Sequence, residues 1–532
     1  MWTRFITISL GFAMAGFLAA GESEPLKLQQ RYRIAKKDGA FEILTRKVAW
    51  EPKQTVIIVC DVWDKHHCLN AVRRVVEMAP RMNQVLEKAR SQGVLIIHAP
   101  SSCMEPYKDH PARKRALNAP RAVNLPKDIG QWCHKIPAEE KGTYPLDQSD
   151  GGEDDDLAEH AKWHKELAGL GRNPRAPWKS QYDVIKIHDQ DAISDSGVEI
   201  WNLLVERGIK NVILLGVHTN MCVLGRPFGL RQLAKNGKNV VLMRDMTDTM
   251  YNPQRWPFVS HYHGTDLIVE HIEKFVCPTI TSDQLIGGSP FKFIADVRPR
   301  VVLAIAESEY DTHKTLPPLA KRIFEDKLGL ETTILQGSAK DHRIPGMAEA
   351  LPKSDLLVLS IRRVALPEKD LQALRKYLDA GRPLIALRTS SHAFDAKGKH
   401  PKGHAEWVEF DAEVLGGNYH NHYSAGPDTT IQVVSGAEKD PLLAGISLPF
   451  TSKGSLYKTS PLASSAKAIL TGTTPKQKPE PIAWTNTYKK KARIFYTALG
   501  HKDDFQNPQF NRLMDNAARW CLGMTIPSTE KK

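Results

Sequence analysis

The sequence predicts an α/β protein of two three-layer α/β/α domains, each built on a mainly parallel sheet. With 532 residues the chain is too long for one hydrophobic core, and its 41% of apolar residues can fill two. Short β-branched runs alternate with stretches of helical spacing, which is typical of strand–helix units around a parallel sheet. The alternation stops at a stretch rich in Gly, Pro, Ser and Thr and then restarts. We place the domains at residues 50–285 and 298–525, with a linker at 286–297.

The N-terminus has the three parts of a secretory signal peptide. A charged start ending at Arg4 precedes an uncharged run from Phe5 to Ala20, and small residues up to Gly21 precede Glu22. The run is about 16 residues long, short of the roughly 20 needed to span a bilayer. We therefore expect a signal peptide at residues 1–21 and a periplasmic or secreted protein. After cleavage we expect no stable membrane span.

Charge and cysteine content narrow the class of protein further. The formal net charge is +13, but Lys and Arg are scattered and an acidic run at 153–156 interrupts them, which favours a solvated surface over nucleic-acid binding. Seven cysteines are too few for a disulfide scaffold, and the odd number leaves a free thiol. No Cys-x-x-Cys motif occurs, which argues against a structural zinc site. We expect no metal and no cofactor. His66–His67 and Asp109–His110 are the pairs able to bind a metal, and we interpret them as surface residues rather than ligands.

The first domain should contain five strands with intervening helices. Residues 55–60 (TVIIVC) and 211–217 (NVILLGV) are apolar runs of the kind found in buried parallel strands. Residues 101–180 are polar and rich in Pro, Lys and Asp, which predicts a long surface insertion with short helices. The remaining expected strands are 94–98, 183–186 and 239–244, and the expected helices are 71–92, 197–207 and 222–236.

The second domain repeats the same pattern. Its expected strands are 301–306, 355–360, 383–387 and 493–497, with a final helix near 511–521. This pattern predicts a second α/β sandwich, and no short internal repeat is present.

Three reactive side chains of the first domain follow expected strands. Ligands bind outside the carboxyl ends of strands in open parallel sheets, and Asp61, Lys186 and Cys222 all fall there. Cys222 begins an expected helix, whose free N–H groups and dipole would lower the pKa of the thiol and stabilise an oxyanion. An Asp within reach can accept the thiol proton. Taken singly, each residue also has a structural interpretation as packing, a cap or a solvated charge.

The motif Gly216-Val217-His218-Thr219-Asn220-Met221-Cys222-Val223 resembles the nucleophile loop of the isochorismatase-like cysteine hydrolases. The opening strand ending in Asp61, the Ile185-Lys186 segment before Ala192-Ile193-Ser194, and the later Leu242–Asp245 segment follow that family's order. The resemblance covers about residues 50–285 and implies a Rossmann-type fold and the catalytic set Asp61, Lys186 and Cys222. Lys179 is the alternative lysine.

The resemblance also implies a mechanism and a substrate class. Asp61 would deprotonate Cys222, the thiolate would attack the carbonyl of a small-molecule amide or ester, and water would cleave the thioester. The amides of Met221 and Cys222 would hold the oxyanion, and a cis peptide would join Val217 and His218. Members of the family often associate, so the resemblance implies a homo-oligomer.

The sequence departs from the family at the presumed pocket. Trp63 stands where members often have Gln, and an indole would narrow the pocket. The segment from His98 to Cys103 lacks the Asp-x-His metal motif of nicotinamidases, so a nicotinamidase is disfavoured. We take Trp63, His98 and Asp245 as candidate pocket residues.

Residues 298–525 resemble the trehalose-utilisation (ThuA-like) family. The resemblance rests on the segment from Asp355 to Leu387, on Gly416–His420 and on Arg493–His501. It implies a flavodoxin-like fold related to class I glutamine amidotransferases, but Arg388-Thr389-Ser390-Ser391-His392 follows the central strand without a cysteine, so we expect no glutaminase. A carbohydrate-binding or sugar-modifying role is the alternative function. Its candidate pocket residues are Arg388, Ser390, His392, His420, His422 and His501.

Overall fold

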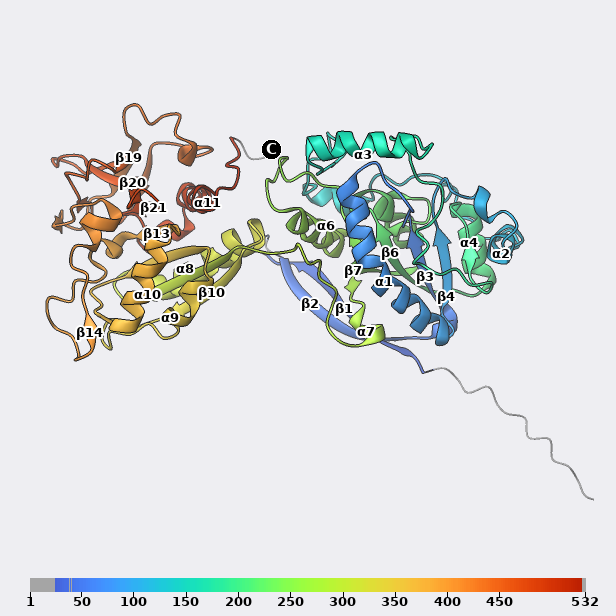
Figure 1. Ribbon diagram of the computed structural model, residues 1–532. Helices are drawn as coiled ribbons and strands as arrows, with labels where there is room; N and C mark the ends of the chain where they lie inside the picture. Colours follow the sequence, from blue (N-terminus) through green and yellow to red (C-terminus); the bar gives the residue numbers. More distant parts are fainter. Residues whose placement is uncertain (1–23, 38, 40, 529–532) are drawn as a thin grey trace, which may run out of the picture. The chain divides into compact units, whose positions relative to one another are not determined.

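The computed structural model describes residues 24–37, 39 and 41–528 (Figure 1). The expected signal peptide lies outside these residues. The chain forms two compact units, and the boundary between Phe291 and Lys292 falls inside the predicted linker. Two earlier segments, Thr143–Ala158 and Thr249–His271, belong to the second unit, which the continuous domain ranges did not anticipate. Arg519 of the second unit donates hydrogen bonds to the carbonyls of Pro257 and Phe258 in one of these segments, at 3.2 and 2.7 Å.

The first unit is built on an eight-stranded sheet in the order β2-β1-β8-β7-β6-β3-β4-β5. The strands from β8 to β5 in this order are parallel, and β1 and β2 add an antiparallel edge. The strands are β1 (Leu26–Ala35), β2 (Phe41–Trp50), β3 (Thr55–Cys60), β4 (Leu95–Ala99), β5 (Ala192–Ile193), β6 (Asn211–Val217), β7 (Asn239–Asp248) and β8 (Thr279–Ile280).

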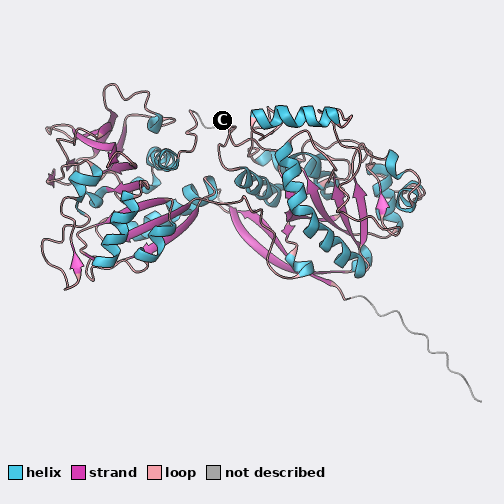
Figure 2. Cartoon of the chain, viewed as in Figure 1, coloured by secondary structure: helices cyan, strands magenta, loops and turns pink. Residues whose placement is uncertain are grey.

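Helices cover both faces of this sheet. Every residue of β3 and of β6 is buried, and alternate side chains of a strand point to opposite faces, so neither face is open to solvent. Figure 2 shows the helices in cyan beside the magenta strands. The helices of residues 69–286 are α1 (Leu69–Ser91), α2 (Pro111–Leu117), α3 (Leu157–Gly169), α4 (Gly197–Glu206), α5 (Leu230–Lys235), α6 (His261–Phe275) and α7 (Asp283–Ile286).

Three sequence-based expectations for the first unit are corrected. The sheet begins at Leu26 rather than near residue 50, because β1 and β2 form a hairpin on its edge. Residues 183–186 form a turn, in which the Ile185 amide donates to the Tyr182 carbonyl at 3.0 Å. The expected helix at 222–236 is broken, because Pro227 has no amide hydrogen to continue it.

The second unit is built on a nine-stranded sheet in the order β10-β9-β11-β13-β21-β20-β19-β16-β17. The first five strands are parallel and the other four extend them in antiparallel fashion. The four predicted strands are confirmed as β9 (Arg300–Ala306), β11 (Leu356–Ile361), β13 (Leu384–Leu387) and β21 (Ala492–Thr497). The other elements are β10 (Glu331–Gln336), β12 (Leu366–Pro367), β14 (His404–Ala405), β15 (Asn421–His422), β16 (Thr429–Val433), β17 (Phe450–Ser452), β18 (Tyr457–Lys458), β19 (Lys467–Thr473), β20 (Glu480–Tyr488), α8 (Thr312–Leu319), α9 (Met347–Ala350), α10 (Glu368–Asp379) and α11 (Pro508–Leu522).

The predicted α/β fold class is therefore confirmed for both units, with an antiparallel extension in the second. Within the described part of the chain, no helix is both long enough and apolar enough to cross a membrane.

Gly216 provides a test of the packing between β3 and β6. Its φ is +113°, and a Cβ there would lie 2.0 Å from the carbonyl oxygen of Cys60. We expect Gly216→Ala to lower the free energy of unfolding by about 2–3 kcal/mol, because strain adds to a backbone clash. Gly237→Ala is the matched control, since Gly237 also has a positive φ but open space around it, and about 1 kcal/mol is expected. Equal shifts of the two urea unfolding midpoints would contradict the clash.

Candidate active site

Asp61 occupies a fully buried position immediately after β3. Its backbone has a φ of 49°, a region that Asp and Asn tolerate better than most residues. One carboxylate oxygen accepts the Ser101 amide at 2.8 Å, and the other accepts Nε of Arg226 at 2.9 Å. A buried carboxylate is stable only when it is paired and hydrogen-bonded, and these contacts meet that requirement.

Cys222 lies beside Asp61 because β6 is the neighbour of β3 in the sheet. Cys60 and Gly216 are paired in register, so the residues that follow the two strands meet at one edge. Cys222 sits in a π-helical turn, Thr219–Val223, and its thiol lies close enough to the Asp61 carboxylate for each group to shift the pKa of the other. A cis peptide joins Val217 and His218, as the family resemblance implied.

The electrostatics of the pair differ from the sequence-based expectation. Burial and then the charge of Asp61 raise the pKa of Cys222 above that of a free thiol, whereas Arg226 lowers it. Burial also raises the pKa of Asp61, against the opposing effects of Arg226, Cys222 and Ser101. The helix terminus therefore does not leave Cys222 as a resting thiolate.

Neither candidate lysine reaches this pair. Lys186 is exposed and its Nζ donates to the Asp183 carbonyl at 2.8 Å, within the turn that replaces the expected strand. Lys179 is also exposed, with Nζ 3.4 Å from the Gly171 carbonyl. The cation beside Asp61 is Arg226, which the sequence analysis missed although it follows Cys222 by one helical turn.

The oxyanion donors are also only partly as expected. The Met221 amide donates to the His218 carbonyl at 3.0 Å, so it is engaged within the loop. Of the two amides predicted to donate to an oxyanion, the one that remains as a candidate is that of Cys222. The side chain of Thr219 anchors the same loop, because its Oγ1 bonds Oγ1 of Thr247 at 2.7 Å and the Asp248 carbonyl at 2.9 Å.

Aromatic side chains form a wall next to the loop. Trp63 is 8% exposed and stacks on Trp178, with ring centroids 4.5 Å apart and planes at 14°. His66 stacks against both indoles and meets the His218 ring edge-on at 4.8 Å. His66 is buried rather than on the surface, and burial holds its pKa well below the usual range. Trp178 and the buried His66 thus join Trp63 in this wall, which the sequence analysis did not anticipate.

The long insertion also contributes Trp132, whose ring packs against Arg226. The guanidinium of Arg226 lies over the Trp132 ring, 5.3 Å from its centroid. A Cβ on Gly225 would lie 2.4 Å from this indole, so only glycine allows the close approach. The Cys133 amide donates to the Gly225 carbonyl at 2.8 Å. Residues near 132 are therefore fixed directly on the turn that carries Cys222 and Arg226.

Two other predicted pocket residues have structural roles. His98 is fully buried, and its ring nitrogens bond Gln181 Oε1 at 3.0 Å and Asp191 Oδ2 at 3.1 Å. Asp245 accepts the amides of Ser282 and Phe291, each at 2.9 Å from the nearer oxygen, and so fixes the segment after β8. The strand continues three residues past Asp245, so Asp248 rather than Asp245 lies opposite Val217 at the carboxyl edge.

Arg388 occupies the corresponding edge of the second unit, directly after β13. It has a φ of 39° and is 3% exposed. Its guanidinium donates to the Ala498 carbonyl at 2.6 Å and lies 4.2 and 4.6 Å from the ring centroids of Tyr310 and Tyr457. Ser390 is fully buried and donates to the Leu359 carbonyl at 3.0 Å. Both predicted pocket residues therefore hold strands and loops together.

The four candidate histidines of the second unit lie in different environments. His392 is nearly buried and stacks on Tyr419 at 4.6 Å, and burial with Arg363 and Arg362 lowers its pKa to about 3. The sequence analysis missed Asp411, whose pKa burial raises to about 7 and whose carboxylate accepts the Tyr419 amide at 2.7 Å. His420 and His422 are exposed, and His501 is half-buried.

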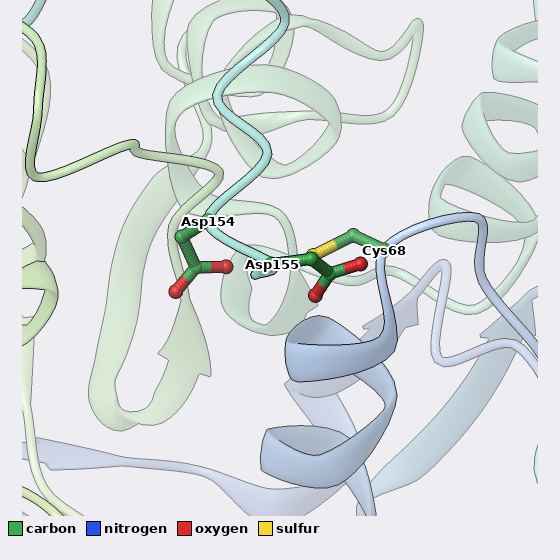
Figure 3. A group of neighbouring side chains, drawn as sticks. All are labelled: Cys68, Asp154 and Asp155. Atoms are coloured by element: carbon green, nitrogen blue, oxygen red, sulfur yellow. The ribbon is translucent and has the colours of Figure 1, made fainter. Parts of the chain in front are cut away.

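Cys68, Asp154 and Asp155, drawn in Figure 3, carry ligand atoms of the types that bind metals. Cys68 is the N-cap of α1, and its sulfur accepts the Ala71 amide at 3.5 Å. Asp154 pairs with His261 at 3.2 Å within the second unit. Because Cys68 belongs to the first unit and both aspartates to the second, they define no metal site within either. All seven cysteines are buried and free of disulfides.

Comparison with known proteins finds a family model that matches most of the second unit. Residues 301–521 match the family model described as trehalose utilisation (ThuA), which confirms the resemblance seen in the sequence. Similar solved structures include a ThuA-like protein from Parabacteroides merdae, at 17% identity, a TM-score of 0.34, and coverage of 43% of this chain and 92% of that one. No curated protein sequence is significantly similar to the chain.

Two further solved structures belong to the class that the first domain resembles. A cysteine hydrolase from Pseudomonas syringae pv. phaseolicola has 15% identity and a TM-score of 0.27, covering 44% of this chain and 92% of that one. An isochorismatase family protein from Burkholderia thailandensis has 12% identity and a TM-score of 0.24, covering 44% and 94% respectively.

The network around His98 generates a pH-dependent stability prediction. Burial would raise the pKa of Asp191, but hydrogen bonds from His98 and Arg90 outweigh it and lower the pKa from 3.8 to about 2. This pKa difference contributes about 2 kcal/mol to stability above pH 4, which is lost as the pH falls through 2. At pH 7, Asp191→Asn should therefore have a free energy of unfolding about 2 kcal/mol below that of wild type, measured by urea unfolding. This difference between the two proteins should become smaller as the pH falls from 4 to 2.

The exposed neighbour Asp189 supplies the control for this measurement. Asp189→Asn should change stability by less than about 0.5 kcal/mol at any pH, because its side chain is 84% exposed. A constant gap between wild type and Asp191→Asn from pH 7 to pH 2 would contradict the assigned network.

Proposed function

We propose that the first unit is a cysteine hydrolase that cleaves a C–N amide or ester bond of a small molecule through a thioester on Cys222. The observation that carries this proposal is that a buried thiol and a buried carboxylate lie next to each other at the carboxyl edge of a parallel sheet. Export to the periplasm or medium is proposed from the N-terminal sequence.

Asp61 moves the proton in the first half of the reaction. It accepts the Cys222 proton as the sulfur attacks the substrate carbonyl carbon, and the carbonyl oxygen becomes an oxyanion. The Cys222 amide is the donor available to that oxyanion. As the tetrahedral intermediate collapses, the bond from carbon to the leaving group breaks and Asp61 protonates the departing amine or alcohol. A thioester remains on Cys222.

Water completes the cycle in the second half. The water oxygen attacks the thioester carbon, and Asp61 accepts a proton from that water. The carbon–sulfur bond then breaks, the proton returns to Cys222, and a carboxylic acid leaves. The neutral wall of Trp63, Trp178 and His66 favours a flat or apolar group on the substrate, since stacked aromatic rings bind such groups well.

The variant Asp61→Asn distinguishes two effects of Asp61, which are proton transfer during turnover and the raised pKa of the Cys222 thiol. Asn tolerates the positive φ of this position and can still accept the Ser101 amide. Turnover of small amides and esters should fall by about 10²-fold or more, because the base is lost. Alkylation of Cys222 by iodoacetamide at pH 8 should become faster, because removing the Asp61 charge lowers the pKa of the thiol.

Cys222→Ser and Cys60→Ser are the matched variants. The first should abolish turnover, whereas the second, one residue from Asp61 on β3, should retain it. Retained turnover in Cys222→Ser, or slower alkylation together with unchanged turnover in Asp61→Asn, would contradict the proposal.

A second candidate function rests on the aromatic cluster of the second unit. Tyr419 stacks on His392 and lies 4.7 Å from the Tyr457 ring, and the carboxyl of Asp411 bonds its backbone. Aromatic faces beside carboxyl and imidazole groups are suited to carbohydrate, the class that the family description names. This unit would then bind or modify a sugar.

Sugar-dependent thermal stabilisation tests this second candidate. A disaccharide that binds should raise the unfolding temperature of wild type and of Cys222→Ser equally, and Tyr419→Ala should remove the shift. Loss of the shift in Cys222→Ser with retention in Tyr419→Ala would assign sugar binding to the first unit instead.

A further inference from the structure

We propose that Arg226 takes the place of the lysine in the catalytic set, as the positioning residue that keeps Asp61 ionised and oriented toward Cys222. This inference rests on the proposed hydrolase function of the first unit. It follows from the contact between Nε of Arg226 and a carboxylate that has no solvent exposure.

The surroundings of Asp61 explain why a cation is needed there. Its titratable neighbours, Cys60 on β3, Cys103 after β4 and Cys222, are all thiols with raised pKa values, and none can neutralise a buried carboxylate. The Ser101 amide supplies one hydrogen bond to Asp61. Removing one partner of a buried ion pair leaves an uncompensated charge, so without Arg226 the pKa of the Asp61 carboxyl would rise.

Arg226 is itself held in place by the turn that carries the nucleophile. Its amide donates to the Cys222 carbonyl at 3.0 Å, and its guanidinium rests on the Trp132 ring. The side chain is 23% exposed, and Asp61 strongly favours its charged form. The cation and the nucleophile therefore belong to one turn of the chain, whereas Lys186 belongs to a turn elsewhere on the surface.

The ion pair has a definite effect on pH dependence. Arg226 lowers the pKa of Asp61 and that of Cys222. The active form has an ionised Asp61 and a protonated Cys222, so activity rises as the pH passes the Asp61 pKa and falls above the Cys222 pKa. Neutralising Arg226 raises both pKa values, and both limbs of the profile must move to higher pH.

The test compares Arg226→Gln, Arg226→Lys and Lys186→Gln in the full-length protein. Arg226→Gln should slow the reaction of Cys222 with iodoacetamide at pH 8 by about tenfold, the change expected for one pH unit. It should also shift the acid limb of kcat/KM upward by about one unit. Arg226→Lys should restore most of both properties, and Lys186→Gln should match wild type.

Each outcome decides the inference. A uniform loss of activity in Arg226→Gln without a shift of the limbs would show a purely structural role, and a shift caused by Lys186→Gln would return the role to that lysine. Circular dichroism and the rescue by Arg226→Lys exclude unfolding. The alkylation readout needs no substrate, so it tests Arg226 even if Cys222→Ser proves active and the proposed function fails.

Discussion

The carboxylate of Asp61 is buried between a thiol and a guanidinium, and the chemistry proposed for the first unit depends on that placement. Strands β3 and β6 are paired in register and both end at the same edge, so Asp61 and Cys222 meet without any long connection. Burial raises the pKa of both groups, which keeps the proton on sulfur and makes the carboxylate a stronger base than it is in water. The pair is therefore suited to moving one proton between sulfur and a leaving group.

The sequence predicts the strands that build this site better than it predicts the loops. Residues 55–60 and 211–217 form strands with the expected bounds, because short apolar β-branched runs have few alternatives in a parallel sheet. The expected strand at 183–186 fails because its short apolar pattern also suits a turn, and Lys186 moves out of the site with it. Local pattern carries no information on which charged side chain reaches a distant carboxylate.

Arg226 and Trp178 are two site residues that the sequence analysis did not find, for two different reasons. Arg226 follows Cys222 by four residues, so the expected helix already placed both on one face, and that spacing was the available signal. Trp178 stacks on Trp63 across more than 100 residues of sequence, through an insertion without regular periodicity. In the second unit, too, the position along the chain did not indicate the role of the residue. Arg388 follows the central strand, where a nucleophile is expected, but its guanidinium packs against the rings of Tyr310 and Tyr457.

The most direct test of the account is to trap the acyl group on Cys222. The protein is mixed with an activated acetate ester, quenched in acid during turnover, digested and analysed by mass spectrometry. The account predicts an acetyl group on the peptide that contains Cys222, at a level that falls when the ester is exhausted. Turnover of the ester with no acetyl group on Cys222, or with the label on another cysteine, would contradict it.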